Sequence, residues 1–482
     1  MDSDKSAIEQ PAPQATSRAT PALILVTGVT GFLGKVVLEE LVRRRNNGTV
    51  QFEKLVVLIR QAGGKPPTQR FYDKVVQSPC FKELPPEWHQ DIVVVSGDLM
   101  EADCGVSPDT LAMLSQQTTH IIHCAGCVGF ESSLNVLLAE NVTTSANMLG
   151  LAQRCAHLQR LVMTSTAYVT PHTNEPIWER LVALPRPADV LLDDLHQGRR
   201  DAAEMLAETG HPNKYTLAKC LAEHVVAQKM GRTPVTIVRP SIISASLQHP
   251  FPGWIDSFAA LAAPISAFAL GGLKVLHGDP DAVLDVVPVD AVATCLIDEA
   301  LGLAKYGSCD LNNMNAQARI AHCVSTTARG PRTRDLVFGT VDYFAQPDNV
   351  VLHKPKGCYV GQDDRLFCFY DFFFQYLPVK VAELAALMRL DWTGAARARK
   401  TMVRLQQVDT HFRFFVEHTY DYRCEASVLD PDFDKDRYFS VVLMGLRQNM
   451  LVPLVAKMQQ QHANAADQAE ARKDGSAQRG SG

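Results

Sequence analysis

The segment Thr27-Gly-Val-Thr-Gly-Phe-Leu-Gly34 decides the fold of this chain. It follows an apolar run, Ala22 to Val26, and precedes a helix-like stretch, Lys35 to Arg45. A strand, a glycine turn and a helix in this order suit a nucleotide pyrophosphate, because the N-terminus of the helix faces the anion. Glycines are needed for the tight turn, for close approach of the phosphates and for packing of helix on strand. The residues expected to contact a nucleotide here are Gly28, Thr30, Gly31, Phe32, Leu33 and Gly34.

The first half of the chain alternates apolar strand-like runs with helical patterns, which is typical of parallel β-α-β units. We predict an α/β fold: a Rossmann-type doubly wound parallel sheet with a substrate-binding subdomain, followed by a mainly helical C-terminal domain. The expected strands are Leu23–Val26, Leu55–Ile59, Ile92–Val95, His120–His123, Arg160–Met163 and Thr236–Arg239, and the expected helices are Gly34–Arg45, Asn135–Cys155 and Pro212–Lys229.

Composition shifts divide the chain into five predicted parts. Residues 1–20 are rich in Pro, Ala, Ser and Thr and read as a disordered arm, and the Gln/Ala/Gly/Ser-rich residues 458–482 read as a disordered tail. Between them we predict a nucleotide-binding reductase domain at 21–345, a linker at 346–364 and the helical domain at 365–457.

The composition of the 482-residue chain is that of an ordinary globular protein, with 46% hydrophobic and 21% charged residues. A net charge of −5 gives no general attraction to nucleic acid. The twelve cysteines lack the spacing of a disulfide framework, and Cys124 and Cys127 form a lone C-x-x-C. We therefore expect reduced thiols, no metal site and an intracellular protein, cytoplasmic or peripherally associated with a membrane.

Two apolar stretches bear on membrane contact. Residues 258–273 are uncharged but short and contain Pro264, and residues 367–387 are interrupted by charges. Because a spanning helix needs about 20 apolar residues, neither is a clear transmembrane helix. Both fit buried helices or an apolar substrate wall, and interfacial contact stays open; the oligomeric state is not encoded in any pattern.

The choice of dinucleotide is made at the end of the second strand, Leu58-Ile-Arg60. An NAD site usually places Asp or Glu there, whereas a guanidinium can bind a 2′-phosphate, so we predict NADPH. The alternative is a solvated surface arginine. Asp98, next to Leu99, either binds the adenine or caps a turn. Ala125 and Gly126 are small where a cofactor would pass.

Tyr215-Thr-Leu-Ala-Lys219 places a phenol and an ammonium on one helical face. Together with the glycine turn this pair indicates hydride transfer to a carbonyl, with Tyr215 as the acid and Lys219 lowering its pKa from about 10 together with the oxidised nicotinamide. A second Tyr-x-x-x-Lys, Tyr376 to Lys380, contains a proline and is interpreted as structural.

A hydroxyl at the end of the fifth strand should polarise the carbonyl. Thr166 is the first choice, Ser165 the second, and Thr164 is expected to be a strand residue. His123, Cys124 and Cys127 could act as ligands or nucleophiles, but packing beside the cofactor is the favoured interpretation.

These motifs, in this order, resemble the extended short-chain dehydrogenase/reductases, and more closely the fatty acyl-CoA reductase family. The resemblance runs from Leu23 to about Phe344, and the C-terminal stretch is similar to the "sterile"-type helical domain of that family. It also rests on Ser165-Thr-Ala-Tyr168, Val238-Arg-Pro-Ser241, Pro250-Phe-Pro-Gly-Trp-Ile255 and Leu284-Asp-Val-Val-Pro-Val-Asp290.

The resemblance implies reduction of a fatty acyl-CoA by NADPH to a fatty alcohol through an enzyme-bound aldehyde, with Pro240 and Ser241 also near the cofactor. The segment Phe258–Leu270 and the proline-rich insertion Pro171–Arg200, a suggested lid, are candidates for the acyl channel. The alternatives are a thioester reductase acting on acyl-CoA or acyl carrier protein that stops at the aldehyde, and an extended reductase acting on a sugar nucleotide or sterol. A non-catalytic cofactor-sensing protein is disfavoured, because Tyr215 and Lys219 are both present.

Overall fold

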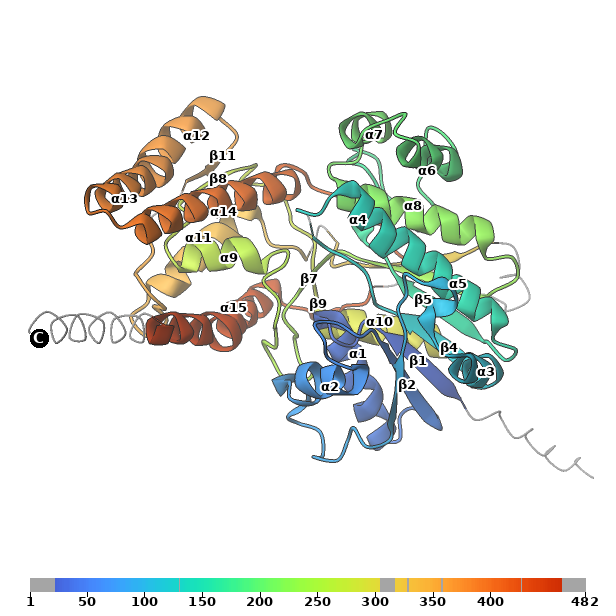
Figure 1. The fold of residues 1–482 in the computed structure, drawn as a ribbon. Coiled ribbons are helices and arrows are strands. Elements are labelled where there is room, and N and C mark those ends of the chain that lie inside the picture. The colour runs from blue at the N-terminus through green and yellow to red at the C-terminus, as the bar shows by residue number, and fades with distance from the viewer. Residues whose placement is uncertain are drawn as a thin grey trace, which may run out of the picture.

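The computed structural model describes residues 22–129, 131–303, 317–326, 329–356, 359–425 and 427–461. The predicted N-terminal arm and most of the predicted tail lie outside these residues. The strands of the main sheet are β1 (Leu23–Thr27), β2 (Lys54–Ile59), β3 (Ile92–Ser96), β4 (Thr118–His123), β5 (Arg160–Thr164), β6 (Val235–Pro240) and β10 (Arg319–Cys323). All pairs are parallel, in the order β10-β6-β5-β4-β1-β2-β3, so the predicted doubly wound sheet is confirmed (Figure 1).

Helices cover both faces of this sheet (Figure 1). Alternate residues of β1 show the division: Ile24 and Val26 pack with α1 and α10, whereas Leu23 and Leu25 pack into the opposite core with α5. Because both faces are buried, the central strands read as continuous apolar runs. The helices of this part are α1 (Phe32–Asn46), α2 (Pro67–Phe71), α3 (Pro108–Gln117), α4 (Leu134–Leu138), α5 (Thr144–Arg154), α6 (Ala188–His196), α7 (Ala202–Thr209), α8 (Lys214–Lys229) and α10 (Val289–Leu301).

A second core lies beside the sheet and joins segments that are far apart in the chain. Residues following β6 pack in it with residues of the C-terminal helices, for example Phe268 with Phe412 and Leu446. Its elements are the strand pairs β7 (Ile242–Ser244) with β9 (Val286–Pro288) and β8 (Val275–His277) with β11 (Tyr359–Gly361), and the helices α9 (Ala262–Ala269), α11 (Thr333–Ala345), α12 (Asp364–Tyr370), α13 (Leu377–Met388), α14 (Trp392–Glu417) and α15 (Lys435–Leu446). Strand β11 thus falls in the range that the sequence suggested as a linker.

The turn after β7, which contains Gly253, attaches the C-terminal helices to this core. Asn449 Nδ2 donates a hydrogen bond to the carbonyl oxygen of Gly253 (2.9 Å), and the Tyr438 hydroxyl donates to that of Ala245 (2.7 Å). A Cβ on Gly445 would lie 2.0 Å from the oxygen of Gly253. Only glycines allow the two backbones to approach this closely.

One helical run in the described part of the chain, Lys435–Gln461, is long and apolar enough to cross a membrane by length and composition. It differs from residues 258–273 and 367–387, the two stretches that were considered as transmembrane helices from the sequence. Val442, Leu446 and Leu451 within it are buried in the second core, and core helices pass the same test of length and hydropathy.

Candidate active site

The glycine turn between β1 and α1 forms an anion site at the carboxyl edge of the sheet. Gly28 has a φ of +79°, and a Cβ there would lie 2.6 Å from the backbone of Cys124 and Ala125. A Cβ on Gly34 would lie 2.2 Å from the oxygen of Gly28. No side chain caps the N-terminus of α1 at Gly31, and no acidic residue occupies its first turn. The N–H groups of that turn therefore suit a phosphate.

Two cavities adjoin this turn, one of about 250 Å³ and one of about 740 Å³. They share Gly28, Gly31, Cys124 and Gly126, so a dinucleotide lying across the turn would reach both. Every site residue predicted from the sequence lines one of them. The smaller is lined by Gly28, Thr30, Gly31, Arg60, Asp98, Leu99, Ala125 and Gly126, and the larger also by Phe32, Leu33, Gly34, Ser165, Thr166, Tyr215, Lys219, Pro240 and Ser241.

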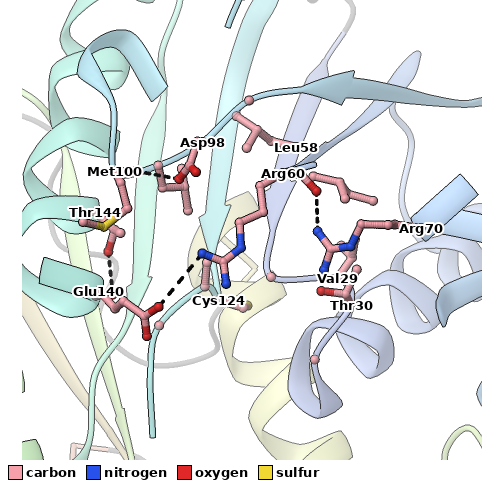
Figure 2. Close-up of a pocket in the computed structure, with 17 residues that line it drawn as sticks. Val29, Thr30, Leu58, Arg60, Arg70, Asp98, Met100, Cys124, Glu140 and Thr144 are labelled. Atoms are coloured by element: carbon pink, nitrogen blue, oxygen red, sulfur yellow. Dashed lines mark hydrogen bonds and ion pairs between the residues drawn. The ribbon is translucent and has the colours of Figure 1, made fainter. Parts of the chain in front are cut away.

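The smaller cavity carries two guanidinium groups (Figure 2). Arg60 follows β2, and its side chain is 54% exposed, with Nη1 4.0 Å from Glu140 Oε1. Arg70, at the end of α2, donates a hydrogen bond to the backbone oxygen of Arg60. Arg70 was not predicted as a site residue, because only the packing of α2 beside β2 brings it here. Asp98 accepts a hydrogen bond from the backbone N–H of Met100 (3.0 Å), which is the turn-capping alternative.

Tyr215 and Lys219 project from the first turns of α8 into the larger cavity. Asn213 begins this helix by accepting a hydrogen bond from the N–H of Thr216 (2.9 Å). Lys219 Nζ donates to the backbone oxygen of Thr164 (3.1 Å), which links α8 to the end of β5. Burial lowers the pKa of Lys219 to about 8.

The Tyr215 phenol is protonated at neutral pH. Burial, and secondarily the Cys127 thiol, raise its pKa in the protein alone. A protonated phenol is the form that a proton donor requires.

The two candidate hydroxyls at the end of β5 differ in their partners. Ser165 Oγ donates to Glu223 Oε1 (2.5 Å), and Glu223 is itself held by the buried guanidinium of Arg239 at 2.5 and 2.9 Å. The Ser165 proton is therefore committed to a structural network. Thr166 Oγ1 accepts from the backbone N–H of Tyr168 (3.3 Å), an interaction that leaves its own proton to donate. The geometry favours Thr166 for polarising a carbonyl.

Asn141 is a site residue that the sequence analysis missed. It lies in a π-helical turn, Ala139–Thr143, which interrupts the predicted continuous helix between α4 and α5. Its Nδ2 donates to the backbone oxygens of Cys127 (3.2 Å) and Leu137 (2.9 Å). A Cβ on Gly126 would lie 2.9 Å from Asn141 Oδ1 and 3.0 Å from Lys219 Nζ, so both side chains converge over Gly126. Such turns recur at functional sites.

Comparison with known proteins identifies the family. Residues 26–296, more than half of the chain, match the family model described as male sterility protein. Mouse fatty acyl-CoA reductase 2 is 33% identical over 280 residues, covering 57% of this chain and 53% of that protein. Chicken fatty acyl-CoA reductase 1 is 33% identical over 285 residues, covering 58% and 54%. The chain belongs to the fatty acyl-CoA reductase family. It spans about half the length of the curated relatives that it matches.

Solved structures support the fold of this fatty acyl-CoA reductase family member. The terminal R domain of the myxalamid PKS-NRPS pathway has a TM-score of 0.59 at 20% identity, with 89% of this chain and 91% of that chain covered. The reductase domain of a non-ribosomal peptide synthetase from Mycobacterium tuberculosis has a TM-score of 0.55 at 16% identity, with 89% and 92% covered. At these identities the likeness concerns the fold alone.

In this family member the larger cavity continues from the Tyr215 end into an apolar chamber. One wall comes from Phe258, Ala263 and Pro264 on and before α9, as the sequence suggested. The opposite wall comes from α14, which was not predicted to take part. Its lining residues are Arg404, Gln407, Val408, His411, Phe412 and Phe415. The insertion 171–200 lines neither cavity; its helix α6 packs on α8, so the lid interpretation is wrong.

His123 at the end of β4 is a packing residue. Burial and the charge of Lys219 lower its pKa to about 3, and its Nδ1 lies 2.8 Å from Thr27 Oγ1. The ring is therefore neutral. Within the part of the chain that the structure describes, no group of three or more His, Cys, Asp and Glu side chains could hold a metal ion.

Proposed function

We propose that this protein uses NADPH to reduce a long-chain fatty acyl-CoA to the fatty alcohol, with release of CoA. The observation that carries the proposal is the larger cavity, which has Tyr215, Lys219 and Thr166 at one end and an apolar chamber between α9 and α14 beyond them. The names of the 33% identical relatives support the acyl-CoA substrate.

The residues fit a nicotinamide dinucleotide. Gly28, Gly31 and Gly126 line both cavities where they meet, and the uncapped N-terminus of α1 suits the pyrophosphate. Arg60 and Arg70 would hold the 2′-phosphate of NADPH. When bound, the dinucleotide supplies the hydride.

Three side chains of the larger cavity would supply the hydrogen bond and the proton that the reduction needs. Thr166 donates a hydrogen bond to the thioester oxygen, where negative charge develops as the carbonyl carbon is reduced. Tyr215 gives that oxygen its proton, and Lys219 stabilises the phenolate that remains. The hemithioacetal breaks its C–S bond and its hydroxyl proton passes to the departing sulfur, so CoA leaves as the thiol and an aldehyde forms. Reduction of the aldehyde to the alcohol needs a second NADPH in exchange for the spent NADP⁺, and Tyr215, reprotonated from solvent, then gives the aldehyde oxygen its proton.

Product analysis tests the proposal directly. The purified full chain is incubated with palmitoyl-CoA and either NADPH or NADH, while thiol release and the products are measured by absorbance and gas chromatography. We expect thiol release with NADPH and accumulation of hexadecanol. Accumulation of hexadecanal would favour the aldehyde-forming alternative, and turnover of a UDP-sugar with no thiol release at any chain length would overturn the acyl assignment.

Tyr215→Phe should lower turnover by about 10³-fold, while NADPH binding stays within a factor of about two. The matched control is Tyr376→Phe, which alters the second Tyr-x-x-x-Lys of the chain and should leave turnover unchanged. An active Tyr215→Phe variant would contradict the assignment of the acid.

A further inference from the structure

The helical run 364–388, here called the outer helix, has its polar and apolar faces reversed. It comprises α12, a π-helical turn (Asp371–Tyr376) and α13 without a break. Its buried side chains are Gln375 and Glu383. Gln375 Oε1 accepts hydrogen bonds from the backbone N–H groups of Lys274 (2.8 Å) and Val275 (3.0 Å). An ordinary surface helix buries its apolar stripe instead.

The opposite face of the outer helix is a large exposed apolar surface. Of the 25 large apolar side chains that are exposed in the described part of the chain, 12 lie between residues 366 and 392. Leu384 is 56% exposed, Met388 81% and Trp392 69%. An apolar surface this concentrated marks a site for a protein partner or a membrane.

The charges around this surface favour an anionic bilayer. Residues 364–400 contain six Lys and Arg and four Asp and Glu, a net charge of +2, whereas the whole chain carries −5. Glu383 is paired with Lys380 and Arg399, and Asp391 caps α14 through the N–H of Gly394 (2.8 Å). In contrast, the exposed cations Arg389, Arg397 and Lys400 have no ion pair among the described residues.

A second copy of the chain fits this surface less well. Trp392 and Tyr376, two of the exposed side chains of this surface, are of the residue types enriched at membrane–water interfaces. A lipid surface satisfies the apolar face and the cations together.

The same surface is joined to the candidate active site through one helix. The outer helix packs along α14, which lies between it and α9 (Figure 1). From α14, Gln407, His411 and Phe412 line the larger cavity. We propose that residues 364–392 dock this protein on an anionic lipid bilayer, with the outer helix lying in the interface. This inference goes beyond the proposed function and does not depend on it.

Vesicle flotation of the full chain tests the docking surface. With vesicles of phosphatidylcholine and phosphatidylserine, the wild-type chain should float. The double variant Phe372→Glu/Leu384→Glu should bind at least about tenfold more weakly, because two exposed apolar side chains that would enter the bilayer become charged. The matched control is Phe338→Glu on α11, since Phe338 is 44% and Phe372 45% exposed; its binding should stay within a factor of about two.

The electrostatic part is tested separately. Arg397→Glu/Lys400→Glu should weaken binding to the mixed vesicles by about fivefold per cation and leave binding to pure phosphatidylcholine unchanged. A thermal unfolding curve is measured for each variant to establish that it is folded. A wild-type chain that does not float, or equal flotation of wild type and Phe372→Glu/Leu384→Glu, overturns the proposal. So does light scattering that finds a dimer which this double variant dissociates.

Discussion

The two cavities beside the glycine turn are built in different ways. Residues 28–144 line all of the smaller one, whereas residues from Gly28 to Phe415 line the larger. The residues that line the smaller cavity lie on short strand-turn-helix connections, and each connection can be recognised in the sequence. The larger cavity is completed by the packing of α14 against α9, and no local sequence pattern encodes that contact. The part that would hold the cofactor is therefore readable from motifs, while the part that would hold the substrate depends on tertiary assembly.

The largest expected effect is on the turn that both cavities share. Gly28→Ala should lower the free energy of unfolding by about 3–5 kcal/mol, since the residue has a positive φ and its Cβ would meet backbone atoms. The control is Gly48→Ala, with a φ of +76° and nothing within 4 Å of the added Cβ; it should cost about 1 kcal/mol. Denaturant unfolding measures both. Equal costs would mean that the close contact with Cys124 and Ala125 is unimportant.

The next prediction separates the two hydroxyls of the larger cavity. Thr166→Ala should lower kcat/KM by about 10²-fold, because a donor to the developing oxyanion is lost. Ser165→Ala should mainly lower the free energy of unfolding, by about 2 kcal/mol, because the buried Glu223 loses a donor. Steady-state kinetics and denaturant unfolding of both variants decide the assignment. Thr166→Ser should recover most of the activity, and the reverse pattern would make Ser165 the polarising residue.

The pKa of Lys219 predicts how activity in the larger cavity depends on pH. Burial holds this pKa at about 8, so the ammonium is charged below that pH and loses its proton above it. We expect kcat/KM to be constant from pH 6 to 7 and to fall about tenfold per pH unit above pH 8. A pH profile with palmitoyl-CoA measures the descending limb. If kcat/KM instead falls only near pH 10.4, the approximate pKa of free lysine, then burial does not lower the pKa of Lys219.

The smallest effect is expected in the smaller cavity. Arg60→Ala and Arg70→Ala should each raise the Kd for NADPH about fivefold and leave the Kd for NADH unchanged, because a half-exposed ion pair is screened by solvent. Isothermal titration calorimetry with both dinucleotides measures the change. Arg154→Ala is the matched control: its side chain is 55% exposed and pairs with Asp103 away from both cavities. Equal losses for NADH would place the two arginines on a group common to both cofactors.

Much of the sheet was predictable because its apolar runs are buried on both faces. The strand expected at Thr236–Arg239, for example, is observed at Val235–Pro240. Within it Arg239 is fully buried, which is possible because Glu223 of α8 neutralises its charge. The glycine turn and the Tyr215–Lys219 pair could be recognised because their spacing is local, and both line the cavities.

The residues that escaped prediction depend on contacts between distant segments. Asn141 lies in a π-helical turn, and its Oδ1 and Lys219 Nζ both lie beside Gly126, whereas the sequence there reads as one ordinary helix. Arg70 and the α14 wall are placed by packing alone. The sequence of the outer helix was judged only as a possible transmembrane segment, from its length and charges. Its reversed faces become apparent only in the structure, where Gln375 and Glu383 are buried.

The wall of the larger cavity that α14 contributes has a consequence for folding during protein synthesis. Residues that form β1 to β6 leave the ribosome long before Phe412 and Phe415 of α14 do. A nascent chain can thus complete the lining of the smaller cavity while the larger cavity still lacks one wall. A nick between α11 and α14 that releases the last helices would remove that wall and leave every lining residue of the smaller cavity in the remaining chain.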